Sequence, residues 1–147
     1  MKKFAFLLVF VMGFSVLHAQ DDTISDEALK AYAIANAAVK SITSTISPMV
    51  NELIEKQEGM TGQRFKELQG TKGDEGKLAA IEAKDWEVQF LNTVNTEIDK
   101  RKDAAKEIIN LMAKYAIGSS NYKTIKAGLK SDDALKARYE TISASLK

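Results

Sequence analysis

Apolar residues recur at helical spacing along the first third of the chain. Between residues 32 and 53 they follow one another at alternating intervals of three and four, which places them on one face of a helix: Tyr32, Ala35, Val39, Ile42, Ile46, Met49 and Leu53. Ser25 can cap this helix, and Asp26 and Glu27 fall in its first turn, where carboxylates face the positive end of the helix dipole. We therefore expect a long helix from about residue 25, whose apolar face needs a partner.

Pro48 lies inside this apolar stripe. Proline removes one backbone donor and crowds the carbonyl group four residues earlier, so it kinks or ends a helix. The apolar spacing continues in phase past Pro48, through Met49 and Leu53. This continuity predicts a kink near residues 45–47 rather than the end of the helix.

A second apolar face follows in the middle of the chain. No Gly or Pro occurs from Lys77 to about Ala116, and Arg101 interrupts an otherwise apolar series on one face: Leu91, Val94, Ile98, Ala105, Ile108, Met112 and Tyr115. Such a segment predicts a second helix of about 60 Å. Two long helices in an antiparallel hairpin would bury both apolar faces against each other.

Glycines mark the connection between these two helices. Five of them fall between residues 59 and 76, and residues 63–69 between them can form at most two helical turns around Phe65 and Leu68. This composition predicts a mobile Gly-rich connection over residues 59–76, loosest at residues 70–76.

The end of the chain is punctuated twice, by Gly118-Ser119 and by Gly128 to Ser131. The last segment repeats apolar residues at helical spacing: Leu135, Tyr139, Ile142 and Leu146. We expect one or two short C-terminal helices that close the hairpin. No strand pattern of period two appears, so the sequence predicts an all-α fold with a single domain at residues 25–147.

The first 19 residues have the features of a secretory signal peptide. Lys2 and Lys3 precede an apolar run over residues 4–17, and Leu17-His18-Ala19 is a plausible cleavage site. The run of 14 residues is shorter than the roughly 20 that span a bilayer, so we expect cleavage rather than a permanent anchor. The mature protein would begin with a polar leader at residues 20–24 and work in the periplasm or outside the cell, with no stable membrane anchor.

Cleavage would also limit the chemistry of the mature chain. His18 is the only histidine and the chain has no cysteine, so cleavage would leave neither Ser-His-Asp or Cys-His nucleophile systems nor the usual zinc and copper ligands. We therefore expect no catalytic residue, metal site or cofactor. Nineteen Lys and Arg against twenty Asp and Glu would remain, and this near-neutral charge argues against a nucleic-acid partner.

Candidate binding residues gather near the Gly-rich connection. Phe65, Trp86 and Phe90 form an aromatic-rich region that is either the core of the hairpin tip or a hydrophobic contact site under a mobile cover. Arg101 interrupts the second apolar face; it either extends its guanidinium group outward from the helix seam or marks a contact with a partner. Because Glu97 precedes Arg101 by four residues and Asp99 precedes Lys102 by three, the basic run of residues 100–102 is expected to form ion pairs along the helix.

Two segments resemble a known family. They are residues 25–33 with Val39 and Ile42, and the closing Tyr122, Ile125, Ser131, Asp132 and Leu135. They resemble the bacterial exported family catalogued as domain of unknown function 4168, over roughly residues 25–42 and 106–139. In this chain Ala116, Ile117 and Gly118 stand where the family has Gly, Leu and Thr, and Asp133 replaces a proline. The resemblance implies export and helices but no activity, and the Gly-rich connection looks like an insertion.

Together these features predict an exported helical protein that acts as a non-enzymatic binding or interaction module of the bacterial envelope. In a chaperone-like version, the tip around Trp86 would bind an unfolded or apolar client. Two alternatives remain open: a small carboxylate-dependent hydrolase, which would need a facing pair of buried acids, and a membrane-surface protein that binds through an amphipathic helix.

Overall fold

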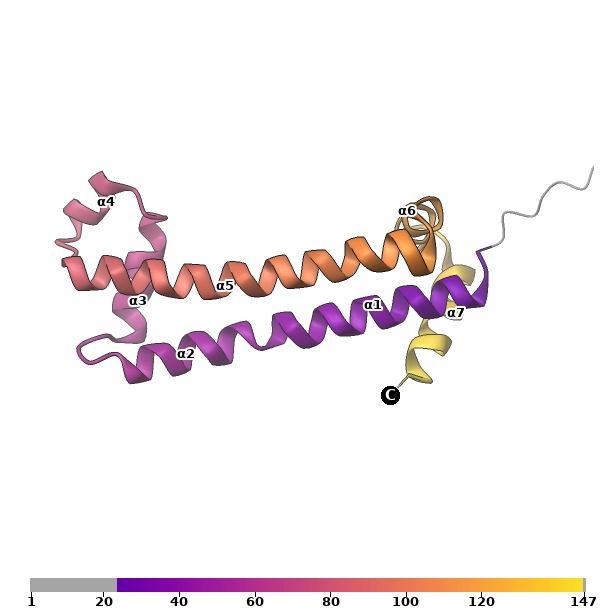
Figure 1. Cartoon of the computed structure of the whole chain (residues 1–147), viewed down its shortest axis with the longest axis horizontal. Helices are drawn as coiled ribbons and strands as arrows, with labels where there is room; N and C mark the ends of the chain where they lie inside the picture. Colours follow the sequence, from indigo (N-terminus) through magenta and orange to yellow (C-terminus); the bar gives the residue numbers. More distant parts are fainter. Residues whose placement is uncertain (1–23, 147) are drawn as a thin grey trace, which may run out of the picture.

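A computed structural model describes residues 24–146, and their helices form a long antiparallel hairpin with shorter helices at both ends (Figure 1). The predicted all-α fold is confirmed, with no strand among these residues. The signal peptide, including His18, and most of the polar leader lie outside the described residues. The elements in chain order are α1 (Asp26–Ser44), α2 (Ile46–Lys56), α3 (Gly62–Thr71), α4 (Glu75–Ala80), α5 (Asp85–Met112), η1 (Ala113–Ile117), α6 (Ser119–Gly128) and α7 (Asp133–Ala144).

The first long helix begins and kinks where the sequence predicts. The Ser25 hydroxyl accepts a hydrogen bond from the Ala28 backbone N–H at 3.2 Å, which caps α1. Pro48 has no backbone N–H to donate to the Ser44 carbonyl. The Thr45 N–H donates to the carbonyl of Ile42, three residues earlier, at 3.2 Å. The helix therefore stops for one residue and resumes as α2, which continues roughly along the direction of α1 (Figure 1).

The second long helix begins later than predicted. A break at residues 81–84 separates α4 from α5, so the expected helix from Lys77 to Ala116 is wrong at its start. The Ala83 N–H donates to the Leu78 carbonyl and the Glu82 N–H to the Ala79 carbonyl, both at 3.0 Å, which is a Schellman ending. Glu82 takes the left-handed conformation, with φ of 51°, that glycine usually supplies. The absence of glycine therefore concealed this helix end.

A π-helical turn changes the register at the end of the second long helix. The predicted apolar series places Tyr115 in the seam, but Tyr115 is 73% exposed and Ile117 is 4% exposed. The prediction for Tyr115 is wrong because η1 is a wider, π-helical turn. The next inward-facing residue after Met112 is therefore five positions later, at Ile117, rather than three, at Tyr115. Ile117 thereby reaches the core at this end of the hairpin.

The Gly-rich connection is folded rather than irregular. Thr61 caps α3 and Asp74 caps α4 through side-chain oxygens that accept from the N–H groups of Arg64 and Lys77. The core that this segment shares with α5 includes Phe65, Leu68 and Leu78. Thr71 is also buried. The expectation of at most two helical turns is therefore wrong, because capping and burial of apolar side chains outweigh the glycines. The mobility of residues 59–76 stays a prediction.

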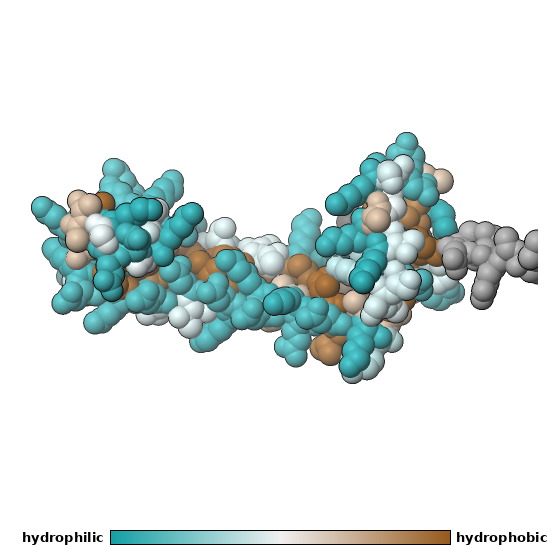
Figure 2. All heavy atoms as spheres, turned by 90° about the horizontal axis from the view of Figure 1, so that it is seen from above, coloured by the Kyte–Doolittle hydropathy of each residue, from teal (hydrophilic) through white to brown (hydrophobic). Residues whose placement is uncertain are grey.

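Two separate cores stabilise the two ends of the hairpin. We call the first end the tip, formed by α2, α3, α4 and the start of α5; its buried residues are Met60, Phe65, Leu68, Leu78, Phe90, Leu91, Val94 and Ile98. We call the second the closed end, with buried Ala28, Leu29, Tyr32, Ile117, Ile125 and Leu135. Between them the helices meet over small buried residues such as Ala35 and Ala105. Figure 2 shows hydrophobic residues between the two ends, framed by hydrophilic ones.

The C-terminal helices close the hairpin as predicted. Tyr32 of α1 packs against Tyr122 of α6 and Tyr139 of α7, with ring centroids 5.3 and 5.9 Å apart. The Asn36 side-chain amide donates to the Tyr139 hydroxyl at 3.2 Å. The cap of α7 is Asp132, whose carboxylate accepts from the Leu135 N–H at 3.0 Å. These contacts bring together the two segments on which the family resemblance rests.

Two glycine substitutions should have opposite effects on stability. Gly118, between η1 and α6, has φ of 85° and ψ of 134°, which L residues rarely adopt, so Gly118→Ala should lower the free energy of unfolding by about 2 kcal/mol. Gly70 lies in α3 with open space around it, so Gly70→Ala should raise that free energy by about 0.5 kcal/mol. Urea unfolding of both variants measures this, and equal stabilities would contradict the prediction.

Candidate functional site

Three of the four predicted site residues lie together at the tip. Phe65 and Phe90 are 4% and 8% exposed, and their rings meet edge to face with centroids 5.9 Å apart. These two side chains belong to the tip core. Trp86, in the first turn of α5, is half-buried and packs beside Gly59, where an added Cβ would lie 3.6 Å from the indole ring.

Trp86 also lines a shallow hollow between α2 and α5. The hollow has a volume of about 360 Å³ and is lined by Leu53, Lys56, Gln57, Trp86, Gln89, Phe90 and Thr93. Of the three aromatic residues, Trp86 is the one that is only partly buried.

The structure places Arg101 away from the three aromatic residues, one helical turn beyond Ile98 of the tip core. Arg101 lies eleven residues beyond Phe90 in α5, about 16 Å along the helix axis. Its guanidinium group donates to the backbone carbonyl and the carboxylate of Glu97, at 2.9 and 3.0 Å. Lys100 also forms an ion pair with Glu97. The hydrogen bond from Lys100, which has the largest effect, and that from Arg101 lower the pKa of the Glu97 carboxyl group. The expected ion pairs along this helix are confirmed.

An ion pair holds α3 against the start of α5. The Arg64 Nε and Nη2 atoms donate to the two carboxylate oxygens of Glu87 at 2.7 and 2.8 Å, in a bidentate arrangement. The same carboxylate accepts from the Lys84 backbone N–H at 2.8 Å, which caps α5. We call this arrangement the Arg64–Glu87 clasp. Sequence reasoning missed it because the two residues are 23 positions apart and only the fold brings them together.

The clasp keeps Glu87 ionised. Hydrogen bonds from Arg64 lower the pKa of the Glu87 carboxyl group to about 2, although burial acts in the opposite direction. Among the acidic residues at positions 24–146, Glu87 is the one that is buried, and its side chain is 5% exposed. An acid with such a low pKa and every oxygen engaged is a structural group and a poor proton donor.

A groove runs along the tip between α2, α3 and α5, and we call it the tip groove. It has a volume of about 620 Å³. Its apolar floor consists of Ile46, Val50, Ile54, Phe65 and Ile98. Its polar rim consists of Ser47, Asn51, Gln63, Lys66 and Gln69, with Gly62 between them.

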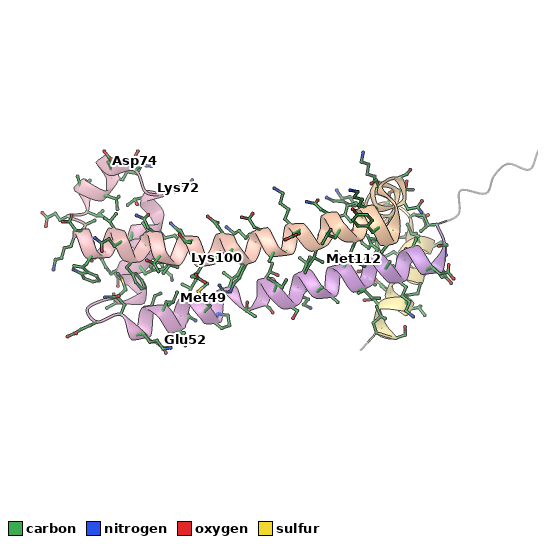
Figure 3. All side chains as sticks on the ribbon, in the orientation of Figure 1. Met49, Glu52, Lys72, Asp74, Lys100 and Met112 are labelled. Atoms are coloured by element: carbon green, nitrogen blue, oxygen red, sulfur yellow. The ribbon has the colours of Figure 1, made fainter. Side chains whose placement is uncertain are left out.

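The row of α2 residues that lines this groove differs from the side of α2 that faces α5. Met49 points from α2 toward α5, whereas Glu52 points away to the outside (Figure 3). Ile46, Val50 and Ile54 form a neighbouring row on α2, which faces α3 instead. The spacing of this row is visible in the sequence. The packing of α3 beside it was not predicted, because the glycine content argued against a long helix there.

No cluster of potential metal ligands accompanies the groove in the part of the chain that the structure describes. Residues 24–146 contain no group of three or more His, Cys, Asp or Glu side chains that could hold a metal ion. Their helices also include none that is both long and apolar enough to cross a bilayer.

Comparisons with known proteins identify no relative. No family model matches the chain, and neither a curated protein nor a solved structure does. The resemblance to the family catalogued as domain of unknown function 4168 therefore stays a prediction from the residues that carry it.

Proposed function

We propose that this chain is an exported, non-enzymatic interaction module of the bacterial envelope, and that it binds its partner through the tip. The observation that carries the proposal is the tip groove, which combines an apolar floor with a polar rim on a folded end of the hairpin. Export rests on the signal-peptide pattern of residues 1–19.

The two ends of the hairpin differ in a way that supports this assignment. At the closed end, Tyr32 packs against Tyr122 and Tyr139, and the hollow that Tyr139 lines there has a volume of about 310 Å³, half that of the tip groove. At the tip, α3 contacts α5 but leaves the row of Ile46, Val50 and Ile54 on α2 only partly buried, and this row lines the groove. The Arg64–Glu87 clasp holds α3 in this position.

The structure provides less support for the other expected functions. The chaperone-like version predicted from the sequence binds its client at aromatic residues under a mobile cover, but Phe65 and Phe90 are buried in the tip core. A hydrolase would require two buried acids in one pocket, whereas Glu87 is tied to Arg64. We therefore do not propose either function. Nor do we propose membrane-surface binding, because a near-neutral chain offers anionic lipid little attraction.

Site-specific photo-crosslinking in the native bacterium tests the proposal. A benzophenone amino acid replaces Gln63 on the groove rim, and in a control variant it replaces Lys123, which is exposed on α6 at the closed end. We expect a discrete cross-linked product from position 63 that is absent from position 123. The proposal fails if position 63 yields no product, or if both positions yield the same ones.

Export is tested separately on the same cells. We expect the protein in the periplasmic or secreted fraction, with an N-terminal sequence that starts at Gln20. A full-length N-terminus in the cytoplasm would contradict export without bearing on the groove.

A further inference from the structure

We infer that the tip groove binds an extended peptide segment that presents apolar side chains beside a carboxylate. This inference rests on the proposed function and specifies the partner of the same site. It follows from the length of the floor, the chemistry of the rim and the sign of the charge beside it.

The floor has the dimensions of a short extended segment. Ile46, Val50 and Ile54 are spaced by four residues on α2 and form a row about 12 Å long. An extended chain rises about 3.3 Å per residue, so the row matches roughly four residues. Since side chains of an extended segment alternate between its two faces, every second side chain would meet the apolar floor.

The rim provides hydrogen-bonding groups that a helical ligand would not need. Ser47 and Asn51 line the α2 side, and Gln63 and Gln69 line the α3 side. Among the side-chain hydrogen bonds formed within residues 24–146, none involves these four side chains. Each carboxamide offers both a donor and an acceptor, as a peptide group does. A helix satisfies its backbone internally, whereas an extended segment brings free N–H and C=O groups to such a rim.

One positive charge lies beside the groove. Lys66 is the charged residue among those that line it, no acidic residue lines it, and the ion pairs within residues 24–146 do not include Lys66. A carboxylate on the ligand would complement this ammonium group, either as a chain end or as an Asp or Glu side chain. An isolated lipid chain fits less well, because an open groove would leave much of its apolar surface in water.

Peptide binding to the purified protein tests the inference. The probes are two fluorescein-labelled pentapeptide libraries with Leu, Ile or Val at the second and fourth positions, one with a free C-terminal carboxylate and one with a C-terminal amide. We expect fluorescence anisotropy to show about tenfold tighter binding of the carboxylate library, as one charge-assisted hydrogen bond would give.

Three variants locate the binding. Lys66→Gln should abolish the preference for the carboxylate, and Val50→Gln should weaken binding of both libraries about tenfold or more. Lys123→Gln, a change of the same type on exposed α6, should leave both unchanged. Circular dichroism confirms that each variant is folded, and Asn51→Leu provides a second groove variant if Val50→Gln unfolds.

Several outcomes would overturn the inference. They are no binding of either library, a carboxylate preference that survives Lys66→Gln, tighter binding of a stapled helical peptide of the same composition, or binding only of fatty-acid vesicles. If the libraries do not bind but a photo-product still forms at position 63, the peptide assignment fails and the proposed function stands. If no photo-product forms either, both fail.

Discussion

Replacing Leu68 with alanine should lower the free energy of unfolding by about 3 kcal/mol, because truncation of a fully buried leucine removes apolar contacts and leaves a cavity. Leu68 is 0% exposed and lies at the centre of the tip core, where α3 packs on α5. Guanidinium unfolding followed by circular dichroism measures the loss.

The same variant should loosen only one end of the hairpin. The tip and the closed end have separate cores joined by a seam of small residues, so hydrogen exchange should accelerate in α3, α4 and the start of α5 but not in α7. Leu29→Ala is the matched control, since Leu29 is also 0% exposed but belongs to the closed end, and it should give the reverse pattern. Uniform acceleration in both variants would show that the hairpin unfolds as one unit.

Removing the charge of Glu87 should have a comparable effect that depends on pH. Glu87→Gln leaves Arg64 without its bidentate partner, and we expect a loss of about 3 kcal/mol in the free energy of unfolding at pH 7. Because the folded pKa of Glu87 is about 2 and the ordinary value is 4.5, the folded state binds this proton less readily than the unfolded state. The contribution is therefore complete above about pH 4.5 and disappears as the pH falls toward 2.

Unfolding measured between pH 2 and pH 7 tests this sign. The difference between wild type and Glu87→Gln should shrink as the pH falls and vanish near pH 2. Glu52→Gln is the control, since Glu52 forms an exposed pair with Lys56 within α2 and its loss should leave stability close to that of wild type. A difference that stays constant across the range would mean that Glu87 acts through packing rather than charge.

The sequence was informative where structure depends on neighbours along the chain. The apolar series from Tyr32 to Leu53 predicted the first long helix, and Pro48 predicted its kink, because helix periodicity and a missing N–H are local properties. The C-terminal caps and apolar positions likewise predicted one or two short helices that close the hairpin, and the structure has two.

Local patterns failed where a distant contact determined the backbone. The glycines at 62 and 70 suggested a loose connection, yet burial of Phe65 and Leu68 against α5 makes α3 a packed helix. Glu82 ends α4 in a conformation that its residue type disfavours, and η1 replaces Tyr115 with Ile117 in the core. In α3, this burial outweighs a helix preference that disfavours each glycine by about 1 kcal/mol.

The candidate site divides in the same way. The sequence pointed to the region around Phe65, Trp86 and Phe90, because aromatic residues near a hairpin turn are visible in one dimension. It could not show that two of them are core or that Arg64 reaches Glu87.

By itself, then, the sequence determined the helical class, the kink, the closing helices and the signal-peptide pattern, since each depends on residue type and spacing within a few turns. Only the tertiary structure decided that the Gly-rich connection is a packed helix, that Glu87 is a clasp rather than an acid, and that a groove lies between α2 and α3. Those features arise from contacts between residues that are distant in the chain. The energies of such contacts cannot be inferred from residue type and spacing within a few turns.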